Sequence, residues 1–363
     1  AMYVASRAAE CMYCSAHTCS FALRRGTTPE ALVGDYTPVE AAVARVAEGM
    51  SRVPADLKRS DIEDLRGFLS ESDIEWVVLG AAVMGFLNKF MDTMGIELEQ
   101  SAINDVSDLI GSTGWTTGKH NWSENFDDDF GLTEGRPLPS SPETNGHSEG
   151  PTGTYKDVPK DSIGTYLKVL KSTPAALRKD LKWSKGMSNR TGMSLLQLED
   201  QVGHAYTTLA SLNHSRAVRA IATVIRDNLN AETTALGLGS KCLIALVYAR
   251  VVGNEVLTAE AVQMAERFAP EIGHRKLTAI GRFASADMTT ATLPPGLSTV
   301  EAASVMLAKT ASPSPSTVSG ITIATVADSL TPAQIVEAVV WISVQQLLHR
   351  LYVFYDADNE FLD

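Results

Sequence analysis

The sequence is poor in cysteine and in positive charge, and both shortages limit what the protein can be. Its 363 residues include four cysteines, too few for a disulfide-stapled scaffold, so we expect a reducing, cytoplasmic setting. Lysine and arginine number 31 against 43 aspartates and glutamates, which leaves a formal charge of -12. Because nucleic acids attract proteins mainly through their phosphate charge, we expect no nucleic-acid partner.

Long apolar runs are also missing. The longest uninterrupted run covers residues 76–87, and it is shorter than the roughly 18 residues that a membrane-spanning helix needs. It predicts a buried helix and no membrane span. No apolar leader precedes residue 10, so we expect no signal peptide.

The residues that are present suffice to build large hydrophobic cores. Hydrophobic residues make up 44% and charged residues 20% of the chain, a composition typical of folded proteins. A chain of 363 residues exceeds what one core usually serves. We expect one domain over residues 1–120 and a second over 161–363. Asparagine, serine, glycine and proline accumulate over residues 121–160, which predicts a linker or long loop.

Helical patterns dominate the sequence, and the alternation typical of strands is not sustained, which predicts an all-α fold. One helix is expected over residues 3–25, where Gly26 ends it. Another begins after Ser70, and the last covers residues 331–355. Only residues 316–326, rich in threonine and valine, leave the choice between helix and strand open.

One internal repeat recurs without any gap. The segment Val39-Glu40-Ala41-Ala42 returns 261 positions later as Val300-Glu301-Ala302-Ala303. The same offset relates four further apolar pairs, which are Leu69 and Leu330, Ile74 and Ile335, Val78 and Val339, and Leu87 and Leu348. We interpret the repeat as a duplicated helical unit.

An acid, two thiols and an imidazole gather near the start of the chain as Glu10, Cys11, Cys14 and His17. On a single helix, at about 100° per residue, Glu10, Cys14 and His17 would lie within about 60° of one another. Cys11 would lie about 60° beyond Cys14. A thiol redox centre needs this set, because the thiolate is the nucleophile, a neighbouring base or cation lowers its pKa, and a second thiol closes a disulfide. The second copy keeps one cysteine, Cys242, without a histidine beside it.

Packing is the alternative for these thiols, because a free cysteine behaves as a small hydrophobic residue. We expect packing for Cys19 and Cys242. A zinc site is a further alternative, but it needs a fourth ligand, and ligands at i, i+3 and i+6 of one helix diverge. We therefore expect neither a metal nor another cofactor.

Two other histidines are candidates of lower rank. His120 lies in a turn rich in glycine and tryptophan, over residues 114–122, that could cover a site. We expect this turn to pack on the surface. His349, at the repeat position of Asn88, is expected to be a polar group that faces a neighbouring helix.

The motif and its continuation resemble the signature of the alkylhydroperoxidase D / carboxymuconolactone decarboxylase superfamily. The matching residues are Cys11-x-Tyr13-Cys14-x-x-His17, Ala22-Leu23-Arg24-Arg25-Gly26 and Thr28-Pro29-Glu30. The resemblance implies two related alkylhydroperoxidase D-like helical bundles, the second degenerate, over residues 1–115 and 230–357. It also implies a homo-oligomer.

The resemblance assigns roles to the motif residues. Cys14 would be the peroxidatic thiolate that a hydroperoxide oxidises to a sulfenic acid, and Cys11 would resolve it as a disulfide. His17 would relay the proton. The family's relay glutamate stands upstream of the first cysteine, at a position before residue 1, and Glu10 is the substitute that the sequence offers.

The expected function is thiol-dependent reduction of a hydroperoxide. A lipoamide- or thioredoxin-type dithiol would reduce the Cys11–Cys14 pair by exchange. One alternative is a lyase or isomerase of the decarboxylase branch, with His17 as acid and base on a small carboxylated substrate. A second is a helical scaffold protein without catalysis.

Overall fold

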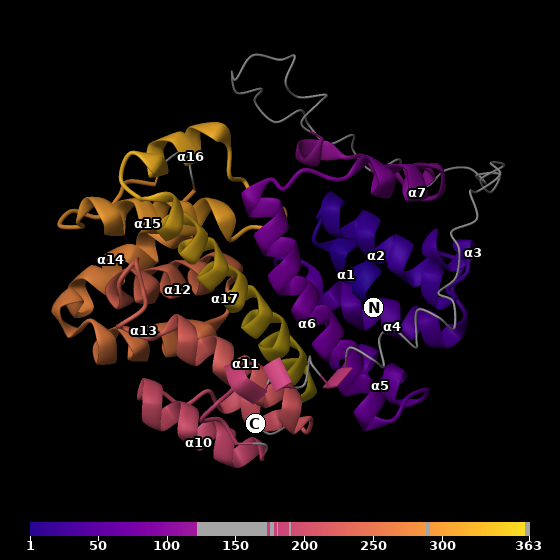
Figure 1. Cartoon of the computed structure of the whole chain (residues 1–363), viewed down its shortest axis with the longest axis horizontal. Helices are drawn as coiled ribbons and strands as arrows, with labels where there is room; N and C mark the ends of the chain where they lie inside the picture. Colours follow the sequence, from indigo (N-terminus) through magenta and orange to yellow (C-terminus); the bar gives the residue numbers. More distant parts are fainter. Residues whose placement is uncertain (122–172, 175–177, 180, 189, 288–290, 360–363) are drawn as a thin grey trace.

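The computed structural model describes residues 1–121, 173–174, 178–179, 181–188, 190–287 and 291–359. Every regular element in these residues is a helix, which confirms the all-α expectation (Figure 1). Of the expected linker, only residue 121 lies among them. We call residues 1–121 the first half and residues 173–359 the second half.

The first half begins with short helices and ends with a long one and its neighbour. Its elements are α1 Met2–Ala8, α2 Met12–Arg25, α3 Pro29–Leu32, α4 Pro38–Ser51, α5 Arg59–Arg66, α6 Glu71–Met94, α7 Gln100–Ile110, η1 Gly111–Thr113 and η2 Gly118–His120.

The second half ends with the longest helix. Its elements are α10 Thr191–Val202, η3 Thr207–Ser211, α11 Ser215–Asn228, α12 Leu238–Val252, α13 Glu255–Phe268, η4 Pro270–Ile272, α14 Gly273–Ser285, α15 Thr299–Ala311, α16 Gly320–Ala327 and α17 Pro332–Asn359. The ambiguous segment, residues 316–326, contributes most of helix α16.

Several helix ends follow from local chemistry. The Ser70 side chain accepts a hydrogen bond from the Asp73 amide and begins α6, as expected. Gly26 ends α2 in the left-handed conformation, with φ at 100°. Three helices of the first half begin 261 positions before three helices of the second half. These first residues are Pro38, Arg59 and Glu71 in α4, α5 and α6, and Thr299, Gly320 and Pro332 in α15, α16 and α17.

The expectation of one continuous helix over residues 3–25 is wrong. Helix α1 ends at Ala8, and Glu10 adopts a left-handed conformation with φ at 53°. Helix α2 then starts at Met12, so Cys11 precedes it. Neither glycine nor proline marks this break, and the small side chains around it fit helical periodicity on both sides.

Helices α6 and α17 join the two halves. They lie side by side through the middle of the molecule and make its most extensive helix pair (Figure 1). One continuous hydrophobic core surrounds them, and it includes Cys11 and Cys14 from the first half and Val339 and Leu348 from α17. The thiol pair thus lies where both halves contribute side chains.

Helix α6 is the one described helix that is long and apolar enough to cross a membrane. Within its most apolar stretch, 56% of the residues are buried inside the protein. Buried core helices pass the same test of length and composition.

Candidate functional site

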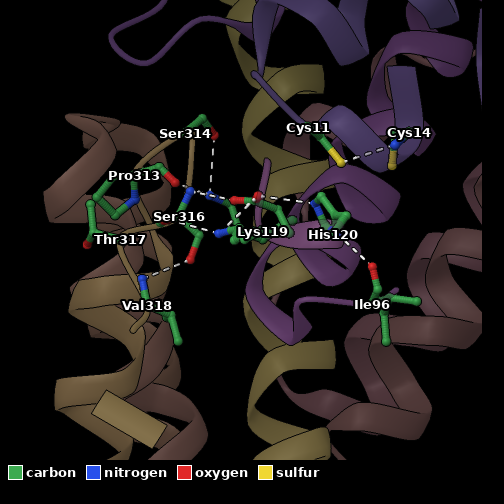
Figure 2. Close-up of polar contacts among 12 residues, drawn as sticks. Cys11, Cys14, Ile96, Lys119, His120, Pro313, Ser314, Ser316, Thr317 and Val318 are labelled. Atoms are coloured by element: carbon green, nitrogen blue, oxygen red, sulfur yellow. Dashed lines mark hydrogen bonds and ion pairs between the residues drawn. The ribbon is translucent and has the colours of Figure 1, made fainter. Parts of the chain in front are cut away.

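Cys11 stands at the start of helix α2 and caps it. Its sulfur accepts a hydrogen bond from the Cys14 amide at 3.4 Å (Figure 2). The first amides of a helix have no partner within the helix and carry partial positive charge, which favours an anion at this position. The break between α1 and α2 therefore places the Cys11 sulfur where a thiolate is stabilised.

Both sulfurs of the pair are buried and unbridged. Cys11 is 0% and Cys14 is 4% exposed. Cys19 and Cys242 are also free and buried, as expected for packing residues. Burial therefore does not distinguish the four cysteines, and the difference must come from their neighbours.

His120 is the imidazole that the fold brings to the thiol pair. The turn that holds it is anchored on the start of α2, because the Trp115 indole donates a hydrogen bond to the Met12 carbonyl at 3.1 Å. His120 is 1% exposed, although most other residues of this turn are exposed, so the turn lies on the surface with its imidazole facing inward. Its Nδ1 lies 2.7 Å from the Ile96 carbonyl, and since a carbonyl only accepts, Nδ1 carries a proton (Figure 2).

Asp92 of α6 is the carboxylate of the site. Its Oδ1 lies 3.0 Å from Lys119 Nζ and 3.8 Å from His120 Nε2. Its Oδ2 accepts a hydrogen bond from the Ser316 amide at 2.6 Å. Burial raises the pKa of Asp92, but these donors outweigh it and lower the pKa below its ordinary value, so Asp92 is ionised.

The contacts set the proton positions on the thiol pair. Burial raises the pKa of Cys11, but the hydrogen bond from Cys14 and the neighbouring His120 imidazole outweigh it and lower that pKa to about 6. The hydrogen bond to Cys11, followed by burial, raises the pKa of Cys14. Burial lowers the pKa of His120, but Asp92 and Cys11 raise it to about 9. At neutral pH the site therefore holds a Cys11 thiolate, a Cys14 thiol and an imidazolium.

A segment of the second half, residues 312–318, is held against this site. Lys89 of α6 donates to the Ser312 carbonyl at 2.9 Å, to the Pro313 carbonyl, and to the Ser314 hydroxyl at 3.3 Å. Lys119 donates to the Ser316 carbonyl at 3.2 Å. Figure 2 shows the two cysteines and this segment on either side of Lys119 and His120.

His17 and Glu10 lie elsewhere. His17 Nε2 is 2.9 Å from Glu99 Oε2, and these two side chains are 42% and 56% exposed. The His17 ring packs on Tyr13, with centroids 4.5 Å apart. Glu10 is exposed and lines an open cavity of about 1050 Å³ beside α1 and α4. The structure thus brings Cys11 and Cys14 together and pairs His17 with Glu99.

Sequence reasoning missed the charged residues of the site. Lys89 and Asp92 stand one turn apart near the end of α6, after its long apolar middle. Buried lysine and aspartate are rare unless paired, so these two residues in a buried helix could have indicated a polar site from the sequence. The contribution of residues 312–318 carried no signal, because it depends on how the two halves pack.

The arrangement can support thiol and disulfide chemistry with a nearby proton donor. In the part of the chain that the structure describes, no group of three or more histidines, cysteines or acidic residues is placed to hold a metal ion. Comparison with protein-family models, with curated proteins and with solved structures finds no match to this chain.

Proposed function

We propose that this protein is a thiol-dependent oxidoreductase of alkylhydroperoxidase type, which reduces hydroperoxides at Cys11 and Cys14. The observation that carries the proposal is the place of Cys11, at the N-terminus of α2 and beside His120, which lowers its pKa to about 6. A thiolate at neutral pH with a second thiol three residues away is what peroxide reduction requires.

In the proposed reaction, the Cys11 thiolate attacks one oxygen of the hydroperoxide. An S–O bond forms, the O–O bond breaks, and the leaving alkoxide takes a proton from His120. The Cys14 thiol then attacks the sulfenic sulfur, which forms the disulfide and releases water. The family resemblance assigns the attack to Cys14, whereas the raised pKa of that thiol favours Cys11 as the attacking group.

A dithiol of lipoamide or thioredoxin type would return the pair to its reduced form by exchange. We also retain the expectations of a homo-oligomer and a cytoplasmic setting as part of the proposal. Reduction of the disulfide by a dithiol consumes one dithiol for each hydroperoxide, so the two substrates turn over in equal amounts.

The proposed fold is a duplicated alkylhydroperoxidase D-like bundle with a degenerate second copy. The common offset of three helix starts supports it. So do two capping boxes at the same offset, formed by Thr37 and Glu40 at α4 and by Ser298 and Glu301 at α15. The second copy has Cys242 inside α12 and no second cysteine near it.

Single-turnover oxidation tests the proposed function. The reduced protein, freed of reductant, is mixed with hydrogen peroxide or tert-butyl hydroperoxide, and free thiols are counted with time. We expect two thiols to disappear and mass spectrometry to find a Cys11–Cys14 disulfide. Cys11→Ser should abolish the reaction, whereas Cys14→Ser should accumulate a sulfenic acid at Cys11 that dimedone traps.

Two matched controls use the other buried cysteines. Cys19→Ser and Cys242→Ser should react at the wild-type rate, because their thiols lie away from His120. Equal rates for Cys11→Ser and the wild type would remove the catalytic claim. If the folded protein resisted alkylation by iodoacetamide at both Cys11 and Cys14, a helical scaffold would be the better description.

A further inference from the structure

Arg350 of helix α17 is a buried cation at the interface between the two halves. Its side chain is 0% exposed, and its Nη1 donates a hydrogen bond to the Ala81 carbonyl of α6 at 2.7 Å. Complete burial of an arginine is rare in proteins, because the guanidinium loses its hydration.

The guanidinium passes over α6 at a point where that helix has no side chain. A Cβ atom on Gly85 would lie 2.8 Å from Cδ and 3.1 Å from Nε of Arg350. Both distances are shorter than ordinary van der Waals contacts, so any other residue at position 85 would displace the arginine. Gly85 therefore creates the notch through which Arg350 of the second half reaches into the first half.

Two nitrogens of Arg350 have hydrogens to donate and no acceptor. Nε and Nη2 are buried and make no hydrogen bond to any residue that the structure describes. Nor does Arg350 form an ion pair with a described carboxylate. A buried charge without a partner lowers the stability of the folded protein. This cost indicates that Nε and Nη2 donate hydrogen bonds to a group that becomes anionic during the reaction.

The Cys11–Cys14 pair is an anionic group that interacts electrostatically with Arg350 and lies in the same hydrophobic core as helix α17. The charge of Arg350 lowers the pKa of Cys14, against the larger effects of Cys11 and burial that raise it. Burial lowers the pKa of Arg350 itself. Interactions with Tyr248, Cys14 and Cys11 oppose this effect, and the resulting pKa is about 10. Arg350 thus remains protonated at neutral pH and interacts electrostatically with both sulfurs.

We propose that Arg350 is a catalytic residue of the thiol site, whose Nε and Nη2 donate hydrogen bonds to the two oxygen atoms of the hydroperoxide that Cys11 attacks. This inference rests on the proposed function. While the S–O bond forms and the O–O bond breaks, negative charge develops on the leaving oxygen, and Arg350 stabilises it without giving up its proton. His120 supplies the proton that the leaving alkoxide takes. The second half, which lacks the thiol pair, would thereby complete the site of the first.

Two substitutions test the inference, and each acts on Arg350 differently. Arg350→Met removes the donors and keeps an apolar stem. Gly85→Ala leaves the arginine in the chain but displaces it from the notch. Gly80→Ala is the matched control on the same helix, because a Cβ there would meet only Met2 Cγ at an ordinary 3.6 Å. Circular dichroism and thermal unfolding establish that each variant is folded.

The readout is a ratio of two rate constants for Cys11, one for oxidation by hydrogen peroxide and one for alkylation by iodoacetamide. Alkylation needs the thiolate but no stabilised leaving oxygen, so it reports thiolate formation alone. We expect Arg350→Met and Gly85→Ala to slow oxidation about 100-fold, the loss typical of a missing oxyanion donor. Alkylation should change far less, and Gly80→Ala should match the wild type in both.

Parallel losses in oxidation and alkylation would show that Arg350 only supports the thiolate or the fold, and would overturn the inference. So would unchanged oxidation in both variants. A wild-type protein that alkylates at Cys11 but does not react with hydrogen peroxide would instead overturn the proposed function and this inference together.

Discussion

Two buried histidines of this protein differ in protonation state: one is protonated at neutral pH and the other is neutral. His120 in the first half is 1% exposed and His349 in the second half is 2% exposed. Burial lowers the pKa of both. Asp92 and Cys11 then raise the pKa of His120 to about 9, whereas Arg350 and Lys89 lower that of His349 further, to about 3. Burial disfavours the charged form of both imidazoles, and the neighbouring charges reverse this effect only at His120.

The difference traces to one position on the two long helices. Helix α6 carries Lys89 and Asp92, and 261 positions later α17 carries Arg350 and Val353. Both helices thus bury a basic side chain at the same place, but only α6 adds a carboxylate. His349 is instead held by a neutral contact, in which its Nδ1 lies 3.2 Å from Asn254 Nδ2. One carboxylate thus separates a half whose buried imidazole is protonated from a half whose buried imidazole is neutral.

Removal of that carboxylate should have the largest effect. Asp92→Asn leaves Lys119 and His120 without their counter-ion, and loss of one partner from a buried ion pair costs about 3–5 kcal/mol of unfolding free energy. The pKa of His120 should fall and that of Cys11 should rise, because the imidazolium no longer stabilises the thiolate. Urea unfolding measures the first effect, and thiolate absorbance against pH measures the second.

Glu260 provides the matched control in the second half. It is 7% exposed, and both its oxygens lie 2.7 Å from the Tyr352 hydroxyl. Burial raises its pKa to about 7, so glutamine resembles the neutral form already populated. Glu260→Gln should leave the pKa of Cys11 unchanged. An equal shift in both variants would mean that Asp92 has no special relation to the thiol site.

The two histidines should also give opposite dependences of stability on pH. The pKa of His120 is raised from 6.5 to about 9 in the folded protein, so its contribution is complete below pH 6.5 and is lost as pH rises through 9. The pKa of His349 is lowered from 6.5 to about 3, so its contribution is present above pH 6.5 and is lost as pH falls through 3.

Substitution of each histidine should therefore change a different side of the stability curve. His120→Gln should reduce the loss of unfolding free energy at alkaline pH, and His349→Gln should reduce the loss at acid pH. Each change should amount to a few kcal/mol, because one unit of pKa shift corresponds to about 1.4 kcal/mol. Urea unfolding of the wild type and both variants from pH 3 to pH 10 measures this, with pH limits set by the two pKa values. Indistinguishable curves for the two variants would contradict the contrast between the halves.

Much of the fold could be predicted from local patterns. The cap at Ser70, the end of α2 at Gly26 and the last helix all rest on interactions within a few residues, and all are confirmed. The break before Cys11 could not be predicted, because Glu10 takes its left-handed conformation without the glycine that usually marks one.

The site was predictable only in its thiols. The spacing of Cys11 and Cys14 is local, and the structure keeps them in contact. The acid and base came from positions about 80 and 110 residues further along the chain, because Asp92 and His120 reach the pair only through the packing of α6 and the turn after α7. His17 looked suitable because a continuous helix was assumed. Cys14 and His17 still share α2, but the break takes Glu10 and Cys11 off that helix, and His17 pairs with Glu99.

The smallest expected effect separates His17 from His120. His17 pairs with Glu99 near the surface, and exposed ion pairs contribute about 0.2–1 kcal/mol, which salt screens further. His17→Gln should therefore lower stability by less than about 1 kcal/mol and leave the rate of Cys11 oxidation unchanged, whereas His120→Gln should slow it at every pH where the wild-type imidazole is protonated. Stopped-flow oxidation of the two variants at neutral pH gives the comparison directly. A large loss of oxidation rate in His17→Gln, with no loss in His120→Gln, would identify His17 as the proton relay, as the family resemblance implies. It would then no longer be justified to assign proton transfer to His120 and Asp92.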